Sequence, residues 1–149
     1  MVMIMKYTEI ELQYEDIMWF GVDRNGVVFE CTSGGIGCVP LFVINSKEET
    51  VALQTFFFES LRDSSTETLY VPDKDSPLIQ DCKILSRKGL YCFDVAIDDE
   101  QPDLYKKVSA PSTALTLFDL PSDIKSLMEK HIVDVNVEAN TYISVPHGK

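Results

Sequence analysis

The segment from residue 17 to residue 40 constrains the fold most, because it encodes a β-hairpin followed by a glycine-rich bend. Residues 17–22 and 27–31 are largely apolar runs, the second interrupted by Glu30, and in a strand their successive side chains point to opposite faces. Between the runs stands Asp23-Arg24-Asn25-Gly26, a typical tight turn, because Asn and Gly tolerate the positive φ that such turns need. Since both runs are apolar on both faces, we expect a central hairpin that is covered on each side.

The glycine-rich bend at residues 32–40 has three glycines within four residues, at positions 34, 35 and 37. Such a segment permits a sharp backbone turn or the close approach of a ligand. A phosphate-binding loop leads directly into a helix, whereas Val39-Pro40 follows here, so a structural turn is the favoured interpretation. If the loop binds a small ligand instead, the residues expected at the pocket are Trp19, Asp23, Ser33, Gly34, Gly35 and Gly37.

The remaining pattern predicts further strands and two main helices. Strands are expected at residues 8–14, 69–71, 105–110, 133–137 and 141–145, and as a second hairpin of residues 82–85 and 90–96. One helix is expected to open at Ser46, which has capping-box spacing to Glu49, and another to cover residues 121–131. Residues 63–81 read as a loop region around the short strand 69–71. This order predicts an α+β fold: a mostly antiparallel, twisted sheet with two main helices packed on one face.

The length of 149 residues fits one globular domain, residues 1–149, that needs no disulfide for stability. The apolar residues 1–5 are too few for a signal-peptide core or a membrane span, so we expect a cytoplasmic protein without a membrane partner. In that compartment the four cysteines are expected to remain thiols: Cys31, Cys38, Cys82 and Cys92. Their wide spacing lacks the close pairs of a zinc motif, so no metal site is expected.

The net charge is −11, and the negative charge is unevenly spread. It argues against a nucleic-acid ligand, because a phosphate backbone is bound mainly through Lys and Arg. Acidic residues gather without basic ones in two blocks, within residues 7–22 and 89–105, and such blocks can attract a basic protein partner. A solvated surface that keeps the protein in solution is the plainer interpretation. The residues expected to contact a partner are Glu15, Asp16, Asp98, Asp99, Glu100 and Asp103.

The sequence offers no catalytic constellation, and we expect neither catalytic residues nor a cofactor. Histidine is the most common general base, yet His131 is expected at a helix C-terminus and His147 stands two residues before position 149. Neighbouring carboxylates are common in an acidic chain and carry little information about acid–base chemistry. A binding protein is therefore favoured over an enzyme.

Two stretches resemble small bacterial proteins, some of them similar to immunity proteins of contact-dependent or polymorphic toxin systems. The first combines Trp19-Phe20, Asp23 and Gly26 with Ser33-Gly34-Gly35, Gly37 and Pro40, and the second covers residues 105–124. The resemblance implies a protein-binding role, here the neutralisation of a basic toxin partner, and it transfers no catalytic residues. Two alternatives stay open: a small-ligand-binding protein or enzyme that uses the loop 33–38, and a homo-oligomer formed through an exposed strand edge.

Overall fold

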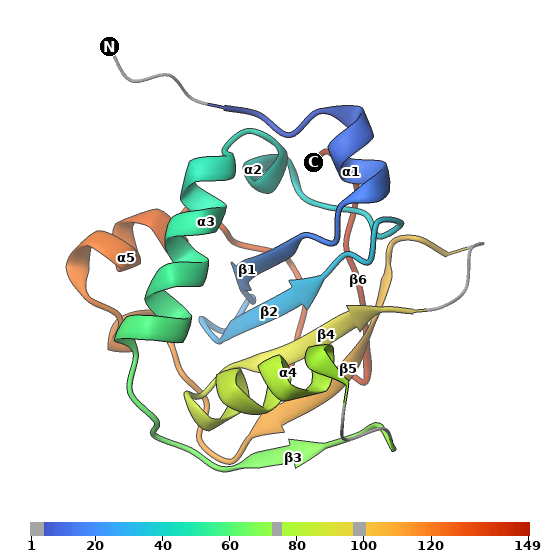
Figure 1. The fold of residues 1–149 in the computed structure, drawn as a ribbon. Helices are drawn as coiled ribbons and strands as arrows, with labels where there is room; N and C mark the ends of the chain where they lie inside the picture. Colours follow the sequence, from blue (N-terminus) through green and yellow to red (C-terminus); the bar gives the residue numbers. More distant parts are fainter. Residues whose placement is uncertain (1–4, 73–75, 97–100) are drawn as a thin grey trace.

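The computed structural model describes residues 5–72, 76–96 and 101–149 and has a mixed α+β fold (Figure 1). Its six-stranded sheet has the order β1-β2-β4-β5-β3, and β6 pairs with β5 as well. The strands are β1 (Met18–Val22), β2 (Val28–Thr32), β3 (Glu67–Leu69), β4 (Tyr91–Val95), β5 (Leu104–Pro111) and β6 (Tyr142–Ser144). Strands β3 and β6 pair with opposite ends of β5, at residues 109–111 and 104–106. Both therefore continue the sheet beyond β5.

The predicted hairpin is confirmed as the antiparallel pair β1–β2, in which Trp19 faces Cys31 across the ladder. Its turn contains Gly26 at a φ of +82°, a conformation that side chains other than glycine adopt only under strain. The buried carboxylate of Asp23 fixes the turn: Oδ1 accepts hydrogen bonds of 2.9 Å from the backbone N–H groups of Asn25 and Val27. Its second oxygen accepts from Val137 N–H at 3.1 Å, so this residue also ties the hairpin to the C-terminal segment.

The expected antiparallel sheet is confirmed in part. Among the described strands four pairings are antiparallel, but β2 and β4 run parallel. The predicted hairpin of residues 82–85 and 90–96 is wrong in its first half, because that half belongs to helix α4 (Pro77–Arg87). Ser76 caps the helix by accepting a hydrogen bond of 3.3 Å from Ile79 N–H, and Pro77 fits its first turn. Helix α4 therefore replaces both the expected strand at residues 82–85 and the end of the loop region expected at residues 63–81.

The described helices include both that the sequence predicts. They are α1 (Glu9–Tyr14), α2 (Leu41–Ile44), α3 (Lys47–Thr55), α4 and α5 (Ser122–Met128), with a π-helical turn η1 (Phe56–Ser60) and a 3-10 turn η2 (Leu117–Asp119). Ser46 caps α3, as expected, by accepting a hydrogen bond of 3.2 Å from Glu49 N–H. The helix expected at residues 121–131 is α5, which ends earlier, at Met128. None of the described helices is long and apolar enough to cross a membrane.

The strand expectations have mixed outcomes. Residues 105–110 and 141–145 are confirmed as β5 and β6, whereas the strand expected at 69–71 lies two residues earlier, as β3. Residues 8–14 do not form a strand but helix α1, because Thr8 and Glu11 exchange the two hydrogen bonds of a capping box. Residues 133–137 form no strand either, although their alternating valines are buried as expected. Their backbone instead binds Val22 and the Asp23 carboxylate.

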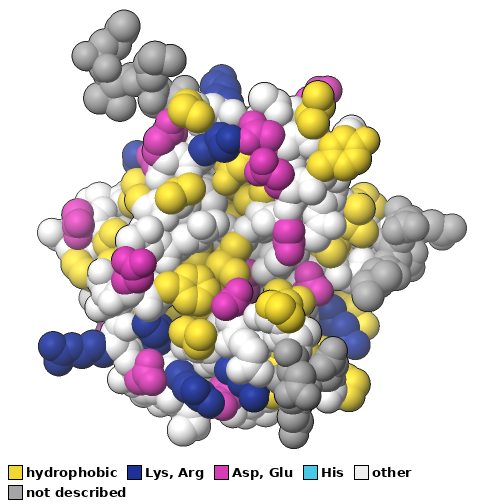
Figure 2. Space-filling model, in the orientation of Figure 1, with side chains coloured by type: hydrophobic (Ala, Val, Ile, Leu, Met, Phe, Trp, Pro, Cys, Tyr) yellow, Lys and Arg dark blue, Asp and Glu magenta, His cyan; other side chains and the backbone are white. Residues whose placement is uncertain are grey.

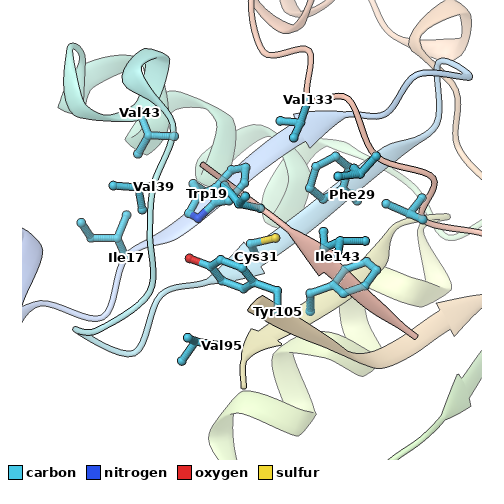
Figure 3. Packing of buried hydrophobic residues seen from close by; sticks show 14 of the residues in the cluster. Ile17, Trp19, Phe29, Cys31, Val39, Val43, Val95, Tyr105, Val133 and Ile143 are labelled. Atoms are coloured by element: carbon cyan, nitrogen blue, oxygen red, sulfur yellow. The ribbon is translucent and has the colours of Figure 1, made fainter. Parts of the chain in front are cut away.

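The sheet is covered on both faces, as the apolar hairpin predicts. One face carries a core around Trp19, Phe29 and Tyr105, covered by residues 39–44 and the C-terminal segment 133–145 (Figure 3). The other face carries a second core with Phe20, Phe57 and Met128. Helices α3, α4 and α5 pack on this second face, and Figure 1 shows α4 in front of β4 and β5. Three helices thus pack on this face, but α2 and Leu12 of α1 pack against the core of the opposite face, so the expectation of two main helices on one face is confirmed only in part.

Candidate functional site

The glycine loop, residues 33–38, is held in place by buried hydrogen bonds. Ser33 exchanges two of them with Ile17, through its own N–H and through its hydroxyl oxygen, each over 2.9 Å. The Ser33 carbonyl then accepts the Gly37 N–H at 2.8 Å, which closes the turn. At its end the Tyr105 hydroxyl donates to the Cys38 carbonyl at 2.7 Å. The loop is therefore a fixed corner on the β1–β2 hairpin.

Two of its glycines are required by close packing. Gly35 has a φ of +79°, and a Cβ added there would lie 3.0 Å from the Gln13 carbonyl oxygen of α1. A Cβ at Gly37 would lie 2.5 Å from the Tyr105 hydroxyl oxygen. The loop thus packs tightly between α1 and β5, which explains its glycines without a ligand.

Both acidic blocks of the sequence reach this loop. From the first, the Asp16 carboxylate accepts a hydrogen bond of 2.7 Å from Gly34 N–H. From the second, the Pro102 carbonyl accepts the Cys38 N–H at 2.8 Å, and Asp103 follows directly. Asp16 and Asp103, which are 87 residues apart in the sequence, therefore both lie beside this loop. Three further residues expected at a partner interface lie outside the described residues: Asp98, Asp99 and Glu100.

Asp94 on β4 connects the blocks electrostatically. Burial of this carboxyl, together with the nearby negative charge of Asp16, raises its pKa to about 6. Asp81 on α4 also has a raised pKa, because it is partly buried. These carboxyl groups therefore lack compensating positive charge. Within the described parts of the chain, no Lys, Arg or His forms an ion pair with Asp16, Asp81 or Asp94.

Two hollows are lined in part by acidic residues, the first by Glu9 and the second by Asp16 and Asp81. The first has a volume of about 620 Å³ and is lined by Glu9, Leu12, Gln13, Gly35, Ile36, Gly37, Cys38, Pro102 and His147. The second, of about 390 Å³, is lined by Asp16, Met18, Gln54, Phe58 and Asp81. Neither set includes Lys or Arg. We define the acidic surface as Glu9, Glu15, Asp16, Asp81, Asp94 and Asp103. Figure 2 shows acidic side chains down the middle of the face between α1 and α4, with basic ones mainly toward its upper and lower margins.

The residues predicted to bind a small ligand are not gathered around one hollow. Trp19, Asp23 and Ser33 are at most 2% exposed. Trp19 makes edge-to-face contacts with Phe29 and Tyr105, and the carboxylate of Asp23 is occupied by backbone N–H groups. Gly34 is exposed but is capped by Asp16. Only Gly35 and Gly37 of this predicted set line the first hollow.

The two histidines lie in different surroundings, and His131 Nε2 is 3.7 Å from a carboxylate oxygen of Glu49. His131 is buried, burial lowers its pKa, and its ring lies against Phe42. His147 and Cys38 line the first hollow together, and Cys with His is a pair used in nucleophilic catalysis. However, burial and then the charge of Asp103 raise the pKa of the Cys38 thiol, opposite to the activation that a nucleophile requires. His147 Nδ1 accepts the Val39 N–H at 3.3 Å.

Comparisons with known proteins do not identify the chain. No family model, no curated protein and no solved structure gives a significant match. The resemblance to immunity proteins therefore stays a prediction, and the geometry of the chain's own residues carries the functional argument.

Sequence reasoning missed a second group of residues. Glu30 on β2, Cys82 on α4 and Cys92 on β4 are buried together, and one potential ligand atom from each lies within 4.8 Å of the others. The only sequence signal was a glutamate inside an otherwise apolar strand, Val27-Val28-Phe29-Glu30-Cys31. Because the two cysteines are ten residues apart and lie on different elements, a search for short metal-binding spacings passes over them.

Proposed function

We propose that the protein is a non-enzymatic binding protein that acts in the cytoplasm and docks its acidic surface on a basic protein partner. The observation that supports this most is the convergence of Asp16, Asp94 and Asp103 around one rigid loop. Like charges brought together without counter-charges cost free energy, and a partner's Lys or Arg side chains would offset that cost. Complementary charge also accelerates encounter and selects among partners.

The partner class is drawn from the sequence resemblance. An immunity-type protein neutralises a toxin by covering its active site, and the acidic surface would suit a toxin with a basic active-site cleft. Each hollow of this surface can receive a protruding basic side chain of the partner, beside Glu9 in the first hollow and beside Asp16 and Asp81 in the second.

The experiment pairs the protein with the product of the neighbouring gene. We expect nanomolar to micromolar binding by calorimetry, and rescue of growth when the two are co-expressed. A triple variant, Asp16→Asn, Asp81→Asn and Asp94→Asn, should weaken binding at least tenfold, because it removes three negative charges that would contact basic side chains of the partner. A control with the same charge change uses exposed positions outside the acidic surface: Asp123→Asn, Glu129→Gln and Glu138→Gln. Equal weakening by both triple variants would reject the proposed surface, and absence of binding and of rescue would reject the immunity role.

A second candidate function is the binding of a small molecule in the first hollow. Its volume of about 620 Å³ lies within the range of 300–1,000 Å³ that is usual for ligand pockets. A fragment screen by NMR tests this function, with Ile36→Trp as a variant that fills the hollow from an exposed position. Shifts at Gly35 to Cys38 that disappear in the variant would support it, whereas shifts that persist would place the ligand elsewhere.

A further inference from the structure

A buried cluster between β2, β4 and α4 has the composition of a soft metal site. Glu30 and Cys92 are direct partners in the parallel pair of strands, and Cys82 approaches them from α4. Each offers one ligand atom, and these atoms lie within 4.8 Å of one another. All three side chains are at most 1% exposed. The cluster is therefore a preformed set of two sulfur ligands and one oxygen ligand.

One carboxylate oxygen of Glu30 gives an independent indication that this cluster binds a ligand. Oε1 of Glu30 accepts a hydrogen bond of 2.5 Å from the Thr32 hydroxyl. Oε2 is fully buried and accepts no hydrogen bond from any residue that the structure describes. A buried polar atom without a partner costs free energy, so such atoms are rare unless a ligand or an ion completes the site. The neighbouring groups that could complete it are the thiols of Cys82 and Cys92.

We propose that Glu30, Cys82 and Cys92 bind a zinc ion. Zinc takes Cys sulfur at about 2.3 Å and carboxylate oxygen at about 2.0–2.2 Å in a tetrahedral arrangement. Ligand atoms in such a site are separated by less than 4.8 Å, so side-chain rotations that draw the three groups together by about 1 Å suffice. Soft thiolate ligands select zinc over magnesium or calcium. The hydroxyl of Ser109 interacts with the Cys92 thiol and donates a hydrogen bond of 3.2 Å to the Cys82 carbonyl, so it would be a candidate for the fourth ligand.

Binding exchanges protons for the metal and changes no oxidation state. The two thiols each release one proton, and the carboxyl of Glu30 releases a third, since burial raises its pKa to about 8 and keeps it protonated at neutral pH. Three negative ligands then surround one Zn²⁺, and Thr32 donates to the carboxylate. Binding should therefore tighten as the pH rises toward 8.

The charges around the cluster favour a cation. Asp94 and Asp16 both raise the pKa of Glu30, and Asp81 and Asp94 act in the same direction on Cys82. Asp16 and Asp81 also line the second hollow. These carboxylates create a negative potential at the cluster, which raises the local concentration of divalent cations.

Titration of the reduced protein with Co²⁺ and then Zn²⁺ tests the proposal. Cobalt bound by thiolates gives intense charge-transfer absorption, which carboxylate ligands alone do not give. We expect one Co²⁺ per chain with this absorption, and its displacement by Zn²⁺. Glu30→Gln should weaken binding at least tenfold, and Cys82→Ala or Cys92→Ala should weaken it further and reduce the absorption.

The matched control is Cys31→Ala. Cys31 is also fully buried and neighbours Glu30 on β2, but its side chain belongs to the core on the opposite face of the sheet. This variant should bind cobalt like the parent chain. Circular dichroism of every variant identifies folding failure, and Glu30→Gln, which has the size of the protonated side chain, retains a folded test protein. Binding without charge-transfer absorption, absence of binding, or equal affinity in Glu30→Gln and the parent would each overturn the proposal.

Discussion

The Asp16 carboxylate accepts a hydrogen bond from the backbone N–H of Gly34, over 2.7 Å. This contact joins the segment between α1 and β1 to the glycine loop after β2, and it sets a negative charge at the rim of the second hollow. The same residue therefore has a structural role through its oxygen and a proposed binding role through its charge. The two roles can be separated, because an amide oxygen accepts a hydrogen bond without carrying a charge.

Asp16→Ala should lower the free energy of unfolding by about 1 kcal/mol, since it removes one exposed hydrogen bond to a charged acceptor. Asp16→Asn should stay within about 0.5 kcal/mol of the parent, because the amide oxygen can replace the carboxylate. Urea denaturation of the three proteins measures both changes. Equal losses in the two variants would show that charge, rather than the hydrogen bond, carries the effect on stability.

Gly37→Ala should destabilise the fold by about 3 kcal/mol, because the new Cβ would overlap the Tyr105 hydroxyl and strain a well-packed site. Gly26→Ala is the matched control, since a Cβ there meets no atom within 4 Å and only the φ of +82° is unfavourable. We expect the control to lose about 1–2 kcal/mol. Thermal or urea denaturation compares them, and a larger loss in Gly26→Ala would contradict the tight packing of the glycine loop.

Asp23→Ala should cost about 3 kcal/mol or more, because it leaves the buried N–H groups of Val27 and Val137 without an acceptor. Asp23→Asn should lie between this variant and the parent, since only one of its two terminal atoms can accept. Asn25→Ala, at an exposed turn position, should change stability by less than about 0.5 kcal/mol. Denaturant midpoints decide the order, and an Asp23→Ala variant as stable as Asn25→Ala would contradict the assigned role.

Glu30 should make the metal-free protein less stable as the pH rises. Its pKa is about 8 in the folded chain and near 4.5 when unfolded, so the folded state holds a proton that the unfolded state has released. The contribution is fully present below pH 4.5 and falls by about 4 kcal/mol by pH 8. Urea denaturation from pH 5 to pH 8 with a chelator measures this slope. Glu30→Gln cannot titrate and should flatten it; an unchanged slope would contradict a buried, neutral Glu30.

The central hairpin was predictable because its local signals agree with its tertiary environment. Residues 17–31 combine apolar runs, an Asn-Gly turn and a capping aspartate, and each of these features predicts the same structure, a β-hairpin. The burial of the hairpin on both faces followed from the same composition. Likewise, Ser46 and Glu49 mark a helix start by a spacing that no strand requires.

The errors arose where two local patterns compete. Ile10, Leu12 and Tyr14 alternate as in a strand, but Thr8 and Glu11 form a capping box, and the 70% exposure of Ile10 shows that alternation did not reflect burial. Residues 82–85 are apolar enough for a strand, yet Ser76-Pro77 is a typical helix start. The helix is stabilised because it buries one face against the sheet, and such burial is decided by tertiary packing rather than by the local sequence. The candidate sites were less predictable still, because they are assembled from residues distant in sequence.

The acidic surface is tested most directly by the salt dependence of association with the product of the neighbouring gene. For the parent chain we expect the association rate constant to fall about tenfold between 20 and 200 mM salt, as charge-steered encounters do. The triple variant at Asp16, Asp81 and Asp94 should show a distinctly flatter dependence, and the charge-matched variant at Asp123, Glu129 and Glu138 should follow the parent. Identical salt dependence in the two triple variants would contradict the claim that these carboxylates guide the partner.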